Sequence, residues 1–258
     1  MNLRNLLCTT LFLLIPVTAG AAIDPYTLLR LDQAAFRARP IAMMPVDNLD
    51  GVVMVVGDRY AIVRVIRITD RGMQVLWRSS ALEGGAIQEI FVEDLDGRGG
   101  YDIIVRTQGG QAFVFDDTYA SRWSSVNEDF RRVNAMTIAN LDLDPAYEIL
   151  MVADNQILIY DGDQFNREQQ FVQVYANVLE VVVGNVDSDR EQEVVLNNGR
   201  VLDVITMEPE WETQPFGNMI SLFDIDGDGI DEVIGYGRPG EDTIRIFDVD
   251  ERQEKPFQ

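Results

Sequence analysis

The 258-residue sequence contains no histidine and a single cysteine, Cys8. A Ser-His-Asp triad, a Cys-His pair and a histidine-ligated zinc site are therefore excluded. Cys8 lies in an N-terminal segment that we expect to be removed, so the mature chain is predicted to have no disulfide and no thiol chemistry. Any catalysis would have to rest on carboxylates, arginine, tyrosine or a hard metal ion.

Positively charged residues are also scarce. The chain has 21 Lys and Arg against 43 Asp and Glu, which gives a formal net charge of −22. Such a charge repels nucleic acid and anionic membranes, and it attracts cations. Because 47% of the residues are hydrophobic, the charge does not predict disorder.

The first 22 residues have the order of a secretory signal peptide. Arg4 precedes an apolar run from Leu6 to Val17, and the small residues 19–22 follow it. The run is too short for a comfortable membrane span, which needs about 20 apolar residues. We expect cleavage near Ala21 or Ala22, a periplasmic or extracellular location and no membrane span in the mature chain. The alternative is an uncleaved anchor.

An acidic motif recurs along the rest of the chain. Four copies align without gaps and begin at Asp94, Asn140, Asn185 and Asp224, so that successive copies lie 46, 45 and 39 residues apart. A degenerate fifth copy begins at Asn48. Spacings of this size correspond to one propeller blade per repeat.

The flanks of each copy repeat as well. A short run rich in Val and Ile precedes and follows each acidic loop, and a third run follows a turn. A weaker fourth segment carries an aromatic residue, namely Trp77, Trp123, Tyr175 or Trp211. Short Val- and Ile-rich runs indicate buried strands. Four strands per repeat predict an all-β propeller of about five four-stranded blades over residues 41–258. The alternatives are a β-sandwich with coincidental acidic turns, or a solenoid.

Residues 23–40 do not fit the blade pattern. Asp24 and Pro25 resemble an N-cap followed by proline at the first helical position, and Leu28, Leu31 and Ala35 recur at helical spacing. The segment is predicted to be either a short helix or a strand that closes the ring.

The acidic loops have the chemistry of a calcium site. A sequence Asp-x-Asp-x-Asp-Gly-x-x-Glu offers alternating carboxylates, and glycine at position six allows the sharp turn. Calcium takes six to eight such oxygens. It is not an EF-hand loop, which would need a glutamate at position twelve, where this chain has Gly235. In the last copy the predicted ligands are Asp224, Asp226, Asp228, the carbonyl of Ile230, and Glu232.

The other copies depart from this pattern by degrees. The third and fourth keep four ligands each but have Pro145 and Arg190 in place of the glycine. In the second copy Arg98 replaces one carboxylate, and its charge could substitute for a metal ion. Hydrogen-bonded Asx turns are the alternative at every copy except the last. The predicted ligands of the third and fourth copies are Asn140, Asp142, Asp144, Glu148, Asn185, Asp187, Asp189 and Glu193.

From Ile41 to Asp248 the repeats resemble the FG-GAP and VCBS repeats of β-propellers, the family that includes the calcium-loop blades of integrin α-subunit heads. The last copy carries the resemblance most strongly. It implies a propeller fold, calcium at the matching loops as a structural ion, and a role in adhesion or assembly more often than catalysis.

The function predicted from these features is a secreted, non-catalytic binding or assembly module that contacts protein or carbohydrate. One alternative is a self-assembling subunit of a surface layer or filament. Another is a glycoside hydrolase, which needs two carboxyl groups about 5–9.5 Å apart at the centre of the ring. The three tryptophans could be sugar platforms, but matching positions in the blades favour packing anchors.

Overall fold

The computed structural model describes residues 41–44, 51–142, 144–189, 191–238 and 241–255. The predicted signal peptide and the segment 23–40 lie outside the described residues. The same holds for most of the degenerate first loop, residues 48–50.

The described part of the chain forms five antiparallel sheets, each of four consecutive strands, which we number as blades 1 to 5. Blade 1 contains β1 (Ile41–Met44), β2 (Val52–Gly57), β3 (Val63–Thr69) and β4 (Gly72–Arg78). Blade 2 contains β5 (Ile87–Glu93), β6 (Asp102–Thr107), β7 (Ala112–Phe115) and β8 (Ser121–Ser124), followed by the 3-10 turn η2 (Ser125–Asn127). Blade 3 contains β9 (Val133–Ala139), β10 (Glu148–Ala153), β11 (Gln156–Asp161) and β12 (Arg167–Phe171). Blade 4 contains β13 (Val181–Gly184), β14 (Glu193–Leu196), β15 (Arg200–Asp203) and β16 (Pro209–Glu212), and blade 5 contains β17 (Met219–Phe223), β18 (Glu232–Arg238), β19 (Glu241–Asp248) and β20 (Gln253–Lys255).

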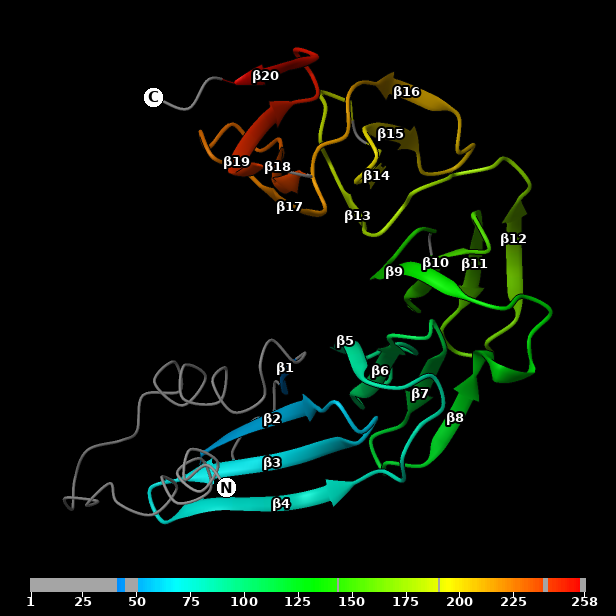
Figure 1. Cartoon of the computed structure of the whole chain (residues 1–258), viewed down its shortest axis with the longest axis vertical. Coiled ribbons are helices and arrows are strands. Elements are labelled where there is room, and N and C mark those ends of the chain that lie inside the picture. Colours follow the sequence, from blue (N-terminus) through cyan, green and yellow to red (C-terminus); the bar gives the residue numbers. More distant parts are fainter. Residues whose placement is uncertain (1–40, 45–50, 143, 190, 239–240, 256–258) are drawn as a thin grey trace, which may run out of the picture.

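The blades follow one another along an arc, with blade 1 at one end and blade 5 at the other (Figure 1). The first strand of each blade lies on the inner side of the arc and the fourth on the outer side. This radial order of four-stranded meanders confirms the predicted all-β propeller with about five blades. No helix among the described residues is long and apolar enough to cross a membrane.

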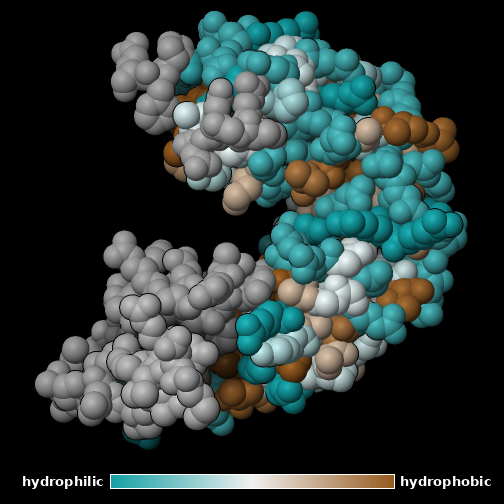
Figure 2. Space-filling view, in the orientation of Figure 1, coloured by the Kyte–Doolittle hydropathy of each residue, from teal (hydrophilic) through white to brown (hydrophobic). Residues whose placement is uncertain are grey.

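The core lies between neighbouring blades. Leu150 and Val152 of blade 3 pack against Val194 and Leu196 of blade 4, and all four side chains are fully buried. Strands that are covered on both faces need apolar side chains on both faces, which explains the continuous Val- and Ile-rich runs. Polar residues cover much of the outside, and the face in Figure 2 is mostly hydrophilic with smaller hydrophobic areas.

The three tryptophans hold the outer parts of adjacent blades together. Trp77 stacks on Tyr119 with the ring centroids 5.2 Å apart, and Trp123 stacks on Phe165 at 6.2 Å. Trp211 contacts Phe216 at 5.8 Å. The rings are therefore packing anchors.

One sequence prediction about the outer strands was wrong. Tyr175 lies after β12 and not within the fourth strand; it is fully buried, and its hydroxyl donates a hydrogen bond to the carbonyl of Met207. The short tail after Asp248 forms β20, in which Glu254 pairs with Phe247. Blade 5 is thus completed by its own chain, through a strand that has no apolar run to mark it.

Candidate cation sites

The acidic loops share one edge of the blades with the turns that lead into the outer strands. Each acidic loop joins the first and second strands of a blade, and in an antiparallel meander the turn from the third to the fourth strand returns to the same edge. We call this the loop edge; it carries residues 94–101, 140–147, 185–192 and 224–231. Side chains from the loops and from the start of each outer strand can therefore meet there.

The acid at position nine has the same role in all four blades. The residue is the first of the second strand and is only 1–5% exposed. One carboxylate oxygen accepts a hydrogen bond from the backbone N–H of position two, which fixes the loop to the strand. The pairs are Asp102 with Leu95, Glu148 with Leu141, Glu193 with Val186, and Glu232 with Ile225.

Among the residues that the structure describes, three groups of carboxylates on this edge have oxygen atoms within 4.8 Å of one another. The structure therefore brings together some of the predicted ligands of each loop, namely positions three and nine in blades 3 and 4, and positions one, three and five in blade 5. The fourth-strand glutamates were not predicted. The groups are Asp142, Glu148 and Glu168 in blade 3; Asp187, Glu193 and Glu210 in blade 4; and Asp224, Asp226 and Asp228 in blade 5.

Several of the other predicted ligands take part in turns. Asn140 donates hydrogen bonds to the carbonyls of Asp144 and Ala146, at 2.9 and 3.1 Å. Asp189 accepts a hydrogen bond from the N–H of Glu191 at 2.8 Å. Asp228 accepts one from the N–H of Ile230 at 2.9 Å. The Asx turns of Asp189 and Asp228 do not exclude a metal ion, because each carboxylate has further lone pairs.

The carboxylates of blades 3 and 4 are crowded by like charge. Burial, together with the neighbouring acids Asp142, Glu168 and Asp144, raises the pKa of Glu148 to about 7. Burial and the corresponding acids of blade 4 raise the pKa of Glu193 to about 7. A bound cation would remove this repulsion.

Blade 4 also has oxygen atoms that lack hydrogen-bond partners. Oδ1 of Asn185, at position one, and Oε2 of Glu210 are both buried and accept no hydrogen bond. A buried acceptor without a partner costs free energy, so each such atom calls for a bound group. Hard oxygen donors without histidine or cysteine fit calcium or magnesium.

Blade 2 carries its own positive charge at the equivalent place. Nη1 of Arg122, on β8, lies 3.1 Å from Oδ1 of Asp102 and 3.5 Å from Asp96, and Nη2 donates to the carbonyl of Asp163. Arg98 was expected to substitute for a metal ion by pairing with Asp94, Asp96 or Asp102. It does pair with Asp96, at 3.5 Å, but it also pairs with Asp163 at 2.9 Å, and its side chain is 67% exposed. Arg122 is the main internal cation, and sequence analysis missed it.

Blade 5 carries an internal cation as well. Nζ of Lys255, on β20, lies 2.6 Å from Glu232, 3.0 Å from Asp248 and 3.2 Å from Asp226. Hydrogen bonds to Glu232 and Asp248 raise the pKa of Lys255 above its usual value. The lysine and these acids line a hollow of about 230 Å³ beside the last loop.

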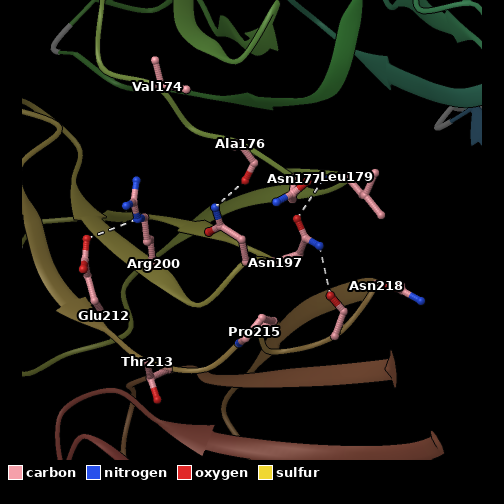
Figure 3. A pocket seen from close by; sticks show the side chains of 12 residues that line it. Val174, Ala176, Asn177, Leu179, Asn197, Arg200, Glu212, Thr213, Pro215 and Asn218 are labelled. Carbon is pink, nitrogen blue, oxygen red and sulfur yellow. Dashed lines mark hydrogen bonds and ion pairs between the residues drawn. The ribbon is translucent and has the colours of Figure 1, made fainter. Parts of the chain in front are cut away.

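The opposite edge of blade 4 has a larger open groove of about 550 Å³ (Figure 3). We call this the linker edge; it carries the connections 172–180 and 213–218 between blades. The buried side chain of Asn197 fastens both connections, because Oδ1 accepts from the N–H of Leu179 and Nδ2 donates to the carbonyl of Gly217. Beside it, Oδ1 of Asn198 is buried without a hydrogen-bond partner.

Two acids on the inner side of the arc interact electrostatically. Burial, and then the charge of Glu89, raises the pKa of Glu180 to about 7. Glu89 forms an ion pair with Arg106 at 2.6 Å.

Comparisons with known proteins reveal relatives in fold. No family model matches the chain, and no curated protein matches it. The WD40 domain of Neurospora crassa Pan2 is similar to it with a TM-score of 0.55 and 14% identity, over 86% of this chain and 66% of that one. The V. cholerae biofilm matrix protein Bap1 gives 0.55 and 18%, over 84% and 38%, and BamB from Moraxella catarrhalis gives 0.50 and 16%, over 81% and 61%. The chain spans less than two thirds of the length of the Bap1 and BamB chains, and these identities establish the propeller fold alone.

Proposed function

We propose that this chain is a secreted, non-catalytic binding β-propeller of the FG-GAP/VCBS kind, in which calcium stabilises the loop edge and a protein partner binds the linker edge. The observation that carries the proposal is a carboxylate cluster at the same place in blades 3 and 4, where positions three and nine of the loop meet a glutamate of the fourth strand; blade 5 has a third cluster, at positions one, three and five. Repetition at equivalent places is what the resemblance to calcium-loop propellers implies. The signal-like N-terminus supports secretion.

Calcium suits these clusters better than other ions. Calcium accepts irregular sets of oxygen ligands at 2.3–2.6 Å, whereas magnesium demands near-ideal octahedral geometry. In blades 3 and 4 the carboxylates of positions three and nine, together with a glutamate of the fourth strand, provide such an irregular set. Calcium there would supply positive charge that holds the loop against the outer strand.

The linker-edge groove supports a protein partner over a carbohydrate. Its wall combines exposed Val174 and Leu179 with the amides of Asn177, Asn198 and Asn218. The exposed side-chain amides of Asn177 and Asn218 can form hydrogen bonds with a peptide backbone. None of the side chains that line it is aromatic, and the three tryptophans are packed between blades. An extended segment of another protein fits this combination of apolar contacts and amides.

Calcium is expected to raise the melting temperature of the mature chain. At ten times the Kd each site adds about 1.4 kcal/mol of stability, so two sites add roughly 3 kcal/mol, or about 6–12 °C. Differential scanning fluorimetry in calcium and then in excess chelator measures the change, with sodium chloride at equal ionic strength as the control. A melting temperature that is the same in calcium and in chelator would refute the calcium part of the proposal.

A peptide library tests the binding part. Phage-displayed peptides selected on the wild-type protein are expected to lose binding to Leu179→Arg and to keep it with Ile205→Arg. Both side chains are more than half exposed, but Ile205 lies in the turn of blade 4 at the loop edge. Peptides that bind both variants equally would show that the groove is not the binding surface.

A further inference from the structure

One position in the outer strand faces the acidic loop in four blades. In each of these blades an aspartate lies at the end of the third strand, and the residue before that aspartate pairs with a residue of the fourth strand. The position in question is the next residue of the fourth strand. In blades 2, 3 and 4 this residue is the extra one of a β-bulge, which turns a side chain toward the loop edge. The four residues are Arg122, Glu168, Glu210 and Lys255.

The residue at this position is positively charged in two blades and negatively charged in the other two. In blades 2 and 5 it is a cation that contacts the acid of position nine, at 3.1 Å for Arg122 and 2.6 Å for Lys255. In blades 3 and 4 it is a glutamate whose oxygen lies within 4.8 Å of that acid. The same spot is therefore filled by an internal cation in two blades and surrounded by acids in the other two.

The residue at loop position one and its hydrogen bonds also differ between the blades with a cation and the blades with a glutamate at this outer-strand position. In blades 2 and 5 position one is an aspartate, and both of its oxygens accept loop N–H groups: Asp94 from Arg98 and Gly99, and Asp224 from Gly227 and Gly229. Glycines at positions four and six, with positive φ, allow this closed turn. In blades 3 and 4 position one is an asparagine, and these glycines are absent.

In blade 4, where the loop begins with asparagine, two buried oxygen atoms are left without a hydrogen-bond partner. Oδ1 of Asn185 and Oε2 of Glu210 accept no hydrogen bond although both are buried. One atom comes from the loop and the other from the outer strand, and Glu210 also lies within 4.8 Å of Asp187 and Glu193. No cationic side chain among the described residues contacts these oxygens, and a bound cation would satisfy them.

We propose that the outer-strand residue selects which loops bind calcium: Glu168 and Glu210 are ligands in blades 3 and 4, while Arg122 and Lys255 take the ion's place in blades 2 and 5. The inference rests on the proposed calcium binding and deepens it. It also reverses the order expected from the loop motif, because the loop with the best motif already holds Lys255.

The side chain of Arg122 is held in place by more kinds of contact than the side chain of Lys255. Arg122 lies over the ring of Phe165 and bonds to the carbonyl of Asp163, so it is fixed from two sides. The side chain of Lys255 is 32% exposed and contacts only carboxylates among the groups described. Removing its charge leaves the full Asp224–Glu232 loop free to bind an ion.

Equilibrium dialysis against calcium, with metal analysis of the mature full-length chain, tests the selection. We expect two ions per wild-type chain, one in Glu210→Gln and in Glu168→Gln, and three in Lys255→Gln. Glu212→Gln is the matched control, because this side chain lies on the same strand as Glu210 but is 54% exposed and pairs with Arg200. It should bind two ions.

The melting temperatures in chelator and in calcium distinguish a calcium ligand from a residue with only a structural role. In chelator Glu210→Gln should melt at or above the wild-type temperature, because one of several repelling carboxylates is gone; in calcium it should melt below it. If the wild type binds no calcium, the proposed function fails. If it binds ions and Glu168→Gln, Glu210→Gln and Lys255→Gln all keep the count of Glu212→Gln, only the outer-strand selection is overturned.

Discussion

Replacing Arg122 with methionine is expected to destabilise the protein by about 4 kcal/mol in chelator, a fall in melting temperature of roughly 8–16 °C. Methionine keeps most of the volume over Phe165 but removes the charge. Asp102, which is 3% exposed, then lies beside Asp96 without its cation. Removing one partner of a buried pair costs far more than the pair is worth, because the other charge stays buried.

The pH dependence of this stability loss tests whether the unpaired charge of Asp102 causes it. Burial already raises the pKa of Asp102, and losing Arg122 raises it further, so the folded variant binds a proton more tightly than the unfolded chain. The penalty should therefore grow as the pH rises from 4 to 8. The control is Arg98→Met, whose exposed ion pairs contribute about 1 kcal/mol or less. Equal losses in the two variants, or no dependence on pH, would contradict the role given to Arg122.

Replacing Phe216 with alanine is expected to cost about 4 kcal/mol. Phe216 is fully buried in the connection between blades 4 and 5, with its ring 5.8 Å from Trp211 and 4.8 Å from Phe247. Alanine would leave a cavity where the last blade packs against its neighbour. Gly235 shows how close this contact is, because a Cβ there would lie 2.2 Å from the carbonyl oxygen of Phe216.

Chemical denaturation monitored by tryptophan fluorescence measures the loss. Phe223→Ala provides the comparison, since Phe223 is 62% exposed on the same blade and should cost less than about 1 kcal/mol. If Phe216→Ala is as stable as Phe223→Ala, blade 5 does not depend on this packing.

The blade pattern could be predicted from sequence because it is local. Each Val- and Ile-rich run is short and bounded by an acidic loop, so period and length identify the strands. Position nine could be predicted for the same reason. The acid that fixes each loop lies only seven residues from the backbone N–H that donates a hydrogen bond to it, as with Glu232 and Ile225.

The outer-strand residues could not be predicted in this way. Glu210 lies 17 positions after Glu193 and is brought back to the loop by the meander and a bulge, which no local motif reveals. In the last blade the loop motif misled, because Lys255 lies 23 positions beyond Glu232 in a strand, Gln253–Lys255, that has no apolar residue. Aligning the fourth strands by their pairing, and not by their aromatic residues, is what reveals the position.

An anomalous difference map from crystals grown in calcium tests the account most directly. It should show one peak between Asp142, Glu148 and Glu168 and another between Asp187, Glu193 and Glu210, each 2.3–2.6 Å from carboxylate oxygens. The place between Asp96 and Asp102 should hold Arg122 and no peak. An absence of peaks at both middle blades, or a single peak at the last loop, would contradict it.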